Sequence, residues 1–115
     1  SLPAVTRSIK LQKRAAKEGF DWKKPEDTLK KVKEELNELT FEMKANNKKK
    51  IREELGDLLF SCINLSRKLG IDTETVIRES NRKFEKRFKK MEKKMNKKSL
   101  KWELKNLEKE WQNSK

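Results

Sequence analysis

The sequence contains no histidine and no tyrosine, and it has only one cysteine, three glycines and two prolines in 115 residues. The lone Cys62 cannot close an intramolecular disulfide, and the lack of histidine excludes the common zinc sites that require it. A metal in this protein must therefore be bound by oxygen, the ligand that Mg²⁺ and Mn²⁺ prefer. So few glycines and prolines argue against a β architecture with many turns and favour long helices.

Long apolar segments are also missing. No run approaches the roughly 18 apolar residues of a membrane-spanning helix, and the first ten residues lack the apolar centre of a signal peptide. We therefore expect a cytoplasmic protein with no membrane partner. The length suits one domain, so residues 1–115 are expected to fold as a single unit. Because only 32% of the residues are apolar, one copy buries little, and we expect an oligomer that covers a further apolar face.

Apolar residues recur at helical spacing along the chain and predict five helices. They are expected over about residues 4–17, 25–44 and 49–69, then after Asp72 and after Ser99, these two residues acting as N-caps. Gly19 and Gly70 stand where the first and third helices should end. Short connections between long helices favour antiparallel neighbours, so the expected fold is all-α, an antiparallel bundle of four to five helices.

The charged residues are unevenly distributed. Lys and Arg number 32 against 19 Asp and Glu, which gives a formal net charge of +13. Within the basic C-terminal helical segment, about residues 82–113, the stretch 82–101 holds eleven Lys or Arg and two Glu, a net of +9. Such a run is typical of a nucleic-acid binder, and it equally suits a site that attracts a polyanionic small ligand past its own carboxylates.

A short internal repeat is the most informative feature. Residues 31–39 read KVKEELNEL and residues 50–58 read KIREELGDL. In each copy an aliphatic residue is followed at i+4 and i+7 by leucines, which form one apolar stripe on a helix. At about 100° per residue, the acids at i+3 and i+6 lie together along one edge of that stripe.

These edge positions predict a metal site. If the two helices pack through their stripes, four carboxylates meet at one edge of the interface. Like charges within about 4 to 6 Å oppose joint ionisation unless a cation neutralises them. The spacing therefore predicts Mg²⁺, with Mn²⁺ as the alternative, bound by Glu35, Glu38, Glu54 and Asp57.

A single acidic motif of this kind is common on the solvated face of a helix, where Glu and Lys pair at i, i+4. The second copy in the same phase favours a site instead. So does Gly56, which lies between Glu54 and Asp57. Glycine inside a helix costs about 1 kcal/mol relative to alanine, so its presence indicates a close approach of a ligand or of another backbone.

Cations of the fourth expected helix could complement such a site. Counted from Ile77, Lys83 and Arg87 fall on the same relative edge as the carboxylates do on their helices, where they could face a phosphate held by the metal. They fit equally well on the general basic face of the helix, with Lys86 and Lys90.

Taken in order along the chain, the motifs resemble the MazG nucleoside triphosphate pyrophosphohydrolase family, whose signature is EExxE followed by ExxD. The segments that carry the resemblance are Leu2-Pro3-Ala4, Lys10 to Ala16, Gly19-Phe20-Asp21-Trp22, Glu34-Glu35-x-x-Glu38, Glu54 to Phe60, Asn64 to Arg67 and Asn81-Arg82-Lys83-Phe84-x-x-Arg87-Phe88. They cover nearly the whole chain, and the ordered set is far more specific than EExxE alone. The similarity is to the C-terminal domain of tandem MazG proteins, so we expect an excised domain or a stand-alone relative.

The resemblance implies a MazG-like fold in a homodimer, with a bundle formed across the interface. It implies hydrolysis of an NTP or dNTP between the α and β phosphates, which releases the monophosphate and pyrophosphate and clears the nucleotide pool. The four residues selected by the edge argument would bind the metal. The implied substrate-contacting residues are Lys31, Lys50, Glu53, Lys83, Arg87 and Trp111.

Individual roles are less definite. Glu38 and Glu53 are the candidates for the general base. Trp111 either stacks on the base of the nucleotide or packs against the bundle or a partner. Its place in the last apolar stripe slightly favours packing, and the family resemblance makes the two equally expected. Phe20 and Trp22 are interpreted as an apolar plug beside the site.

Other functions remain open. A non-enzymatic helical module that binds nucleic acid through residues 82–101 would show salt-sensitive affinity without Mg²⁺-dependent hydrolysis. That hypothesis leaves the acidic repeat unexplained, so nucleic acid is not an expected partner. A narrower substrate such as dUTP, dCTP or phosphoribosyl-ATP would fit a similar helical core. A structural protein that pairs acidic and basic helices would bind no nucleotide.

Overall fold

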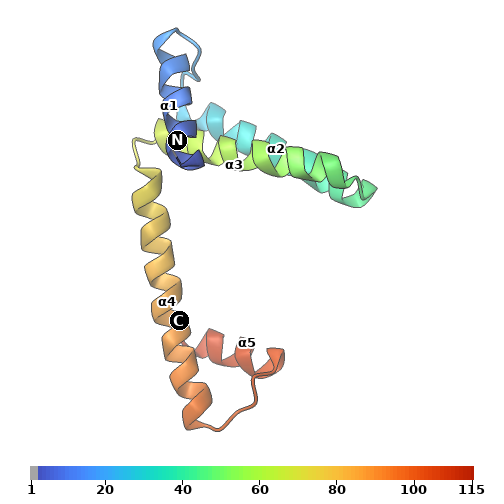
Figure 1. Cartoon of the computed structure of the whole chain (residues 1–115), viewed down its shortest axis with the longest axis vertical. Coiled ribbons are helices and arrows are strands. Elements are labelled where there is room, and N and C mark those ends of the chain that lie inside the picture. The colour runs from blue at the N-terminus through green and yellow to red at the C-terminus, as the bar shows by residue number, and fades with distance from the viewer. Residues whose placement is uncertain (1–2) are drawn as a thin grey trace. The chain divides into compact units, whose positions relative to one another are not determined.

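A computed structural model describes residues 3–115, and the regular structure in that range is entirely helical (Figure 1). The helices are α1 (Ala4–Lys17), α2 (Pro25–Ala45), α3 (Lys48–Lys68), α4 (Thr73–Lys97) and α5 (Leu104–Asn113). The all-α prediction is confirmed. None of the described helices combines the length and the apolar character needed to cross a bilayer. Leu2, quoted above for the family resemblance, lies outside the described residues.

The chain divides into two compact units, residues 1–74 and 75–115, with the boundary just inside α4. Each unit is therefore described by itself. The expectation that residues 1–115 form one domain stays a prediction.

The helix ends follow from the residues that stand there. Gly19, Gly70 and Ser99 come just after α1, α3 and α4 and have positive φ angles of 87°, 70° and 51°. After each of them, the next amide donates a hydrogen bond to the carbonyl five residues back, which closes the helix end. The expectation that Ser99 caps the last helix is wrong: Ser99 terminates α4, and α5 begins only at Leu104.

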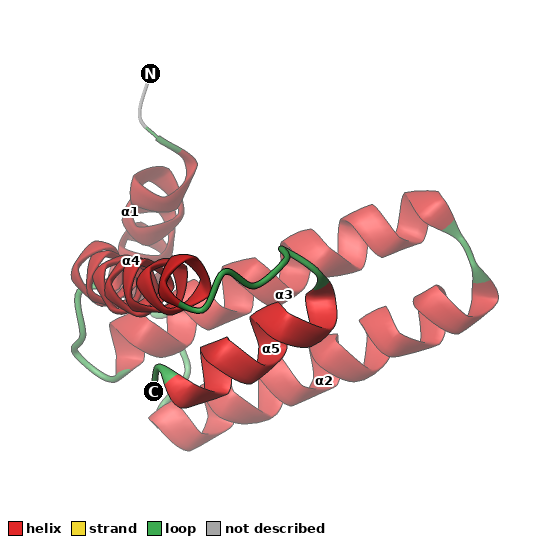
Figure 2. Ribbon diagram, turned by 90° about the horizontal axis from the view of Figure 1, so that it is seen from below, coloured by secondary structure: helices red, strands yellow, loops and turns green. Residues whose placement is uncertain are grey.

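In the first unit, α2 and α3 form an antiparallel hairpin, visible in both ribbon views (Figures 1 and 2). Only Asn46 and Asn47 separate the two helices. Asn46 takes the left-handed conformation that ends α2, and the Asn47 side chain accepts a hydrogen bond of 3.3 Å from the Lys50 amide at the start of α3. Helix α1 packs on α3, where the Gln12 amide donates to the Phe60 carbonyl at 3.1 Å.

The hairpin buries an acid and exposes leucines. Glu35 is only 5% exposed, whereas its neighbour Leu36 is 50% exposed and Leu55 on α3 is 45% exposed. The apolar stripes of α2 and α3 are therefore only partly buried against each other, and Glu35, on the carboxylate edge of the α2 stripe, lies inside the contact. A Cβ placed on Gly56 would meet no atom within 4 Å, so the expected close approach of another backbone does not occur among the described residues.

Many large apolar side chains are exposed across the described chain. Only Met91 and Met95 among the apolar residues are fully buried. The exposed ones are Leu11, Phe20, Trp22, Leu29, Leu36, Phe41, Met43, Leu55, Leu59, Phe60, Leu69, Ile71, Ile77, Phe84, Trp102 and Leu104. Exposed apolar patches of this kind are typical of interaction surfaces.

In the second unit, α5 packs on the C-terminal half of α4 through charged and aromatic groups. Arg87 and Lys94 donate hydrogen bonds to the carbonyls of Trp111 and Asn113, at the end of α5 where the helix dipole favours cations. Glu110 is buried and accepts a hydrogen bond of 2.7 Å from Lys98. This pairing holds the pKa of Glu110 below its usual value.

Candidate functional site

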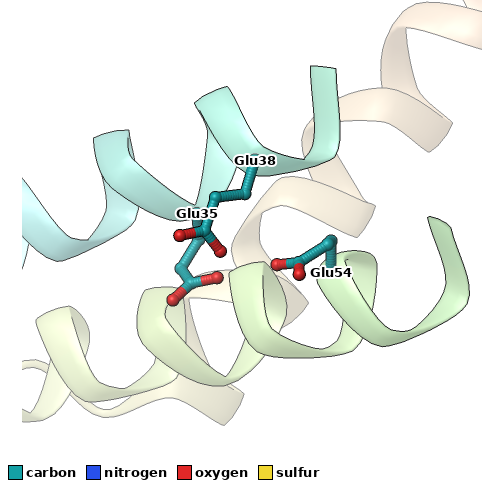
Figure 3. A group of neighbouring side chains, drawn as sticks. All are labelled: Glu35, Glu38 and Glu54. Atoms are coloured by element: carbon teal, nitrogen blue, oxygen red, sulfur yellow. The ribbon is translucent and has the colours of Figure 1, made fainter. Parts of the chain in front are cut away.

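Three carboxylates converge between α2 and α3 (Figure 3). Glu35 and Glu38 extend from α2, one turn apart, and Glu54 extends toward them from α3. One carboxylate oxygen of each residue lies within 4.8 Å of the other two. The i, i+3 spacing of the EExxE motif places the first pair on one face, and the hairpin places the second copy of the repeat opposite it.

Burial leaves part of this group without hydrogen-bond partners. Glu35 is buried, Glu54 is half-buried and Glu38 is exposed. Glu35 Oε2 and Glu54 Oε2 are both shielded from solvent and accept no hydrogen bond. A buried oxygen without a partner costs about 1 to 3 kcal/mol, and more when it is charged. These two oxygens therefore lack a hydrogen-bond donor or a cation among the described residues.

The electrostatics agree with this conclusion. Burial raises the pKa of Glu54 to about 7, and the neighbouring Glu38 and Glu35 carboxylates act in the same direction. Lys31 forms an ion pair with one of these carboxylates: its Nζ lies 2.9 Å from Glu35 Oε1. A divalent cation would neutralise the remaining charge.

The donor set fits a hard cation. Mg²⁺ binds oxygen at about 2.0 to 2.1 Å, so two opposite ligands of one ion lie about 4.2 Å apart. Adjacent ligands of the same ion lie about 2.9 Å apart, so the three carboxylate oxygens, which lie within 4.8 Å of one another, would have to move closer together to bind one ion. The set contains no nitrogen or sulfur, which favours Mg²⁺ or Mn²⁺ over zinc.

An open hollow of about 520 Å³ adjoins the carboxylates, where a ligand would reach them. Its lining consists of Glu34, Asn37, Glu38, Phe41, Glu42 and Glu54. Glu34 belongs to the motif quoted for the family resemblance, whereas Phe41 and Glu42 had no expected role. These two lie one turn beyond Glu38 on α2, and continuing the i, i+3, i+4 count past the motif would have found them.

Several predicted site residues are not part of this group. Asp57 is exposed, one turn beyond Glu54 on α3, and the structure does not bring its carboxylate into the cluster. Glu53 and Lys50 are also exposed on α3. Their roles stay predictions.

The remaining predicted residues lie in the second unit. Lys83 and Arg87 line a hollow of about 520 Å³ together with Lys86, Lys90, Ser114 and Lys115. The Arg87 guanidinium lies 3.8 Å from the centroid of the Trp111 ring and donates to the Trp111 carbonyl at 2.8 and 3.1 Å. One face of Trp111 is thus covered by a cation, in a cation–π contact.

An apolar pocket of about 250 Å³ lies in the first unit beside α1 and α3, lined among others by Phe20, Trp22, Phe60 and Gln12. Gln12 is 6% exposed; its amide nitrogen donates to Phe60, but its Oε1 is buried without a partner. Sequence reasoning assigned Gln12 no role. Helical spacing could have indicated its burial, because this polar residue lies in line with Val5, Ile9 and Ala16 on the apolar side of α1.

The rim of the pocket is fixed by an ionic clamp. Arg67 donates to both carboxylate oxygens of Asp21, at 2.5 and 3.3 Å, and Lys68 lies 3.2 Å from the same carboxylate. The Arg67 contact is the main cause that lowers the pKa of Asp21 to about 2. Asn64 accepts two further hydrogen bonds from Arg67. The connector that carries Trp22 is therefore tied to α3.

Comparisons with known proteins point to one family. Residues 23–92 match the family model of the MazG nucleotide pyrophosphohydrolase domain. A nucleoside triphosphate pyrophosphohydrolase/pyrophosphatase MazG of Thermotoga maritima is 42% identical over 83 residues, 72% of this chain and 31% of that protein. A nucleoside triphosphate pyrophosphohydrolase of Escherichia coli K12 is 39% identical over 88 residues, 75% of this chain and 34% of that protein. The chain spans about a third of the length of these relatives.

The matched region contains the three clustered carboxylates and all the other predicted site residues except Trp111. Gln12 and Trp22 also lie outside it. Because the family model covers more than half of the 115 residues, the resemblance noted in the sequence is confirmed, and the chain belongs to the MazG nucleotide pyrophosphohydrolase domain family.

Proposed function

We propose that this chain hydrolyses nucleoside triphosphates or deoxynucleoside triphosphates between the α and β phosphates, releasing the monophosphate and pyrophosphate. The observation that carries the proposal is the carboxylate cluster, which holds two buried oxygens without partners beside an open hollow. Membership of a pyrophosphohydrolase domain family supports the reaction type. Clearance of the cellular nucleotide pool in the cytoplasm would be the corresponding role.

The cofactor in this proposal is Mg²⁺, with Mn²⁺ as the alternative. Glu35, Glu38 and Glu54 would hold it, and Asp57 would join them by turning its exposed side chain. The ion would screen the phosphates from the carboxylates and lower the pKa of an attacking water. Glu38 is the better candidate for the general base because it is exposed to the hollow, and Glu53 is the second candidate.

Cations of the chain would bind the phosphates. Lys31 and Lys50 belong to the first unit, and Lys83 and Arg87 to the second. The charge of Lys31 and Lys50 would stabilise the departing pyrophosphate, and the substrate contacts expected of Lys83 and Arg87 stay predictions from the sequence. Trp111 would hold the Arg87 guanidinium in place against one face of its indole ring. Only the other face of that ring would then be free to stack on a base.

The apolar pocket beside α1 offers a better place for the nucleobase. Its walls include the rings of Phe20 and Trp22, and its buried Gln12 Oε1 lacks a donor. A base supplies a flat apolar face and an N–H group that would satisfy this oxygen. We propose that these residues contact substrate, which replaces their interpretation as a plug.

We further propose a homodimer. An amphipathic helix in water places its leucines inward, yet Leu36 and Leu55 face outward while Glu35 is buried. This arrangement is stable only if another surface covers the leucines, and a second α2–α3 hairpin presents the matching surface. The bundle would then form across the interface.

The first prediction concerns the reaction and its metal ligands. With Mg²⁺ and a panel of NTPs and dNTPs, we expect the protein to release pyrophosphate. Glu38→Gln keeps the shape of the side chain but removes the charge of a metal ligand. It should slow pyrophosphate release by about 100-fold or more, because losing even a residue that only hydrogen-bonds to a metal ligand typically costs about 10- to 100-fold. Asp57→Ala should also be severely impaired.

Glu26→Gln is the matched control, because Glu26 is exposed in the first turn of the same helix. It should retain wild-type rates, and all variants should keep their helical circular dichroism. Orthophosphate as the product, or full activity in Glu38→Gln, would contradict the proposal. No product together with salt-sensitive binding of nucleic acid would favour the non-enzymatic alternative.

The second prediction concerns pH and stability without metal. The pKa of Glu54 is about 7 in the fold, against 4.5 for an unperturbed glutamate, so between these values the folded protein binds more protons than the unfolded chain. The free energy of unfolding should therefore fall as pH rises through this window. Melting temperatures of the wild type and Glu54→Gln, measured with a chelator at about pH 5 and about pH 8, isolate the contribution of Glu54 to the pH dependence of stability.

The wild type should lose more stability than Glu54→Gln between the two pH values. Added Mg²⁺ should restore the wild type at the higher pH and leave the variant little changed. Identical pH slopes in the two proteins would show that Glu54 does not titrate in this range.

The third prediction tests the base pocket. Gln12→Met keeps the length of the side chain but removes the unpartnered oxygen, together with the hydrogen bond to the Phe60 carbonyl. It should weaken nucleotide binding by up to about tenfold, the value of one hydrogen bond. Tripolyphosphate has no base, so its competition with nucleotide should report unchanged affinity for the variant. Equal loss for both ligands would place the base elsewhere.

The fourth prediction tests the dimer. Light scattering at micromolar concentration should give twice the 13.8 kDa of one chain. Leu36→Lys should yield monomers, because two lysines would face each other across the interface. Leu104→Lys, at a residue of α5 that is 71% exposed, is the control and should leave the mass unchanged. A wild type that is monomeric under these conditions would refute the dimer.

A further inference from the structure

Lys31 occupies an unusual place for a residue assigned to substrate. Its ammonium lies 2.9 Å from Glu35 Oε1 and 3.6 Å from Glu34 Oε1, on the same helix. The Glu35 side chain is 6% exposed and that of Lys31 is 36% exposed, so one partner is fixed in the hairpin and the other reaches solvent. The hydrogen bond to Glu35 is the main cause that raises the pKa of Lys31.

This pair is the sole ion pair to the three clustered carboxylates among residues 3–115. Lys50, the corresponding residue of the second copy of the repeat, is exposed in the first turn of α3 and forms no ion pair in the same range. The two copies therefore differ: one places its leading lysine on the acidic cluster, and the other leaves it in solvent.

The Lys31 ammonium and a divalent cation would compete for the Glu35 carboxylate. Two positive groups within about 4 Å repel by several kcal/mol at the effective dielectric of a protein surface. The lysine has a flexible stem of four carbons and a strongly hydrated ammonium, so it can leave Glu35 and reach another anion nearby. A triphosphate entering the hollow beside Glu38 would be such an anion.

We propose that Lys31 is a placeholder cation: it neutralises Glu35 until a divalent metal binds, and it is then released to the phosphates of the substrate. This inference rests on the proposed function. Lys31 would then compete with the metal for Glu35 in the nucleotide-free protein and bind the phosphates once the metal is present. By thermodynamic linkage, the metal then strengthens nucleotide binding and the nucleotide strengthens metal binding to the same extent.

The experiment measures Mn²⁺ binding to the nucleotide-free protein, by calorimetry and by the electron paramagnetic resonance of the free ion. Lys31→Met removes the competing charge and keeps a good helix former. It should bind Mn²⁺ about tenfold more tightly than wild type, and it should bind tripolyphosphate more weakly. Lys30→Met removes an adjacent exposed charge with no ion pair among the described residues, and it should match wild type for both ligands.

A general change of surface charge would affect Lys30→Met and Lys31→Met alike, so equal Mn²⁺ affinities in these two variants would overturn the placeholder. Unchanged or weaker Mn²⁺ binding in Lys31→Met alone would also overturn it. If that variant does not fold, as judged by circular dichroism, Lys31→Gln provides the same comparison.

The outcome for the inference can be separated from that for the proposed function. A wild type that binds Mn²⁺ and releases pyrophosphate while Lys31→Met binds the ion no better would leave the function intact and the placeholder wrong. A wild type that binds no Mn²⁺, or binds it unchanged after Glu38→Gln, would overturn the function itself.

Discussion

The burial of Glu35 between α2 and α3 is the constraint on which the candidate site depends. A carboxylate that is 5% exposed loses most of its hydration, and the hairpin offers it one lysine in return. With Glu54 held opposite and Glu38 beside it, the arrangement concentrates more negative charge than the described residues neutralise. A buried carboxylate is costly unless it is paired, so leucine at such a position would stabilise the hairpin more than glutamate does, and a cation would offset the cost.

The same geometry connects the site to the outer surface of the hairpin. On a helix, turning one edge of an apolar stripe inward turns the opposite edge outward, because the side chains are fixed at about 100° intervals. Burying Glu35 therefore exposes Leu36, and the matching rotation of α3 exposes Leu55. A partner that covers these leucines would hold both helices in the rotation that brings the carboxylates together. Assembly and metal binding would then stabilise one another.

Much of this could be predicted from the sequence because it depends on short-range spacing. The bounds of α1, the break at Asn46 and Asn47 and the stop at Gly70 all follow from local propensities and caps, and the structure has them where they were expected. The convergence of Glu35, Glu38 and Glu54 follows from helical phase and a two-residue connection. The last helix was misplaced because a serine in the left-handed conformation took the place that glycine usually holds.

Other features depend on contacts between distant residues, which spacing does not encode. The hydrogen bond from the Gln12 amide nitrogen to the Phe60 carbonyl and the clamp of Arg67 on Asp21 each join residues more than 40 positions apart. Periodicity shows that Gln12 interrupts an apolar side of α1, but only the fold shows that it lines an apolar pocket with aromatic walls. Likewise the i+3 spacing makes Glu54 and Asp57 equivalent, whereas in the structure Glu54 alone of the two lies in the cluster.

The net charge of +13 gains meaning only when each cation is assigned to its partner. Arg67 and Lys68 are held by Asp21, Arg87 and Lys94 by the carbonyls of α5, and Lys98 by Glu110. These groups stabilise the fold and are poorly placed to move. Lys31 differs from them because its partner is a predicted metal ligand, so its ion pair is the one that a metal would break. The excess of positive charge, which suggests a nucleic-acid binder, thus includes a lysine that is placed to couple a metal to a phosphate in the proposed function.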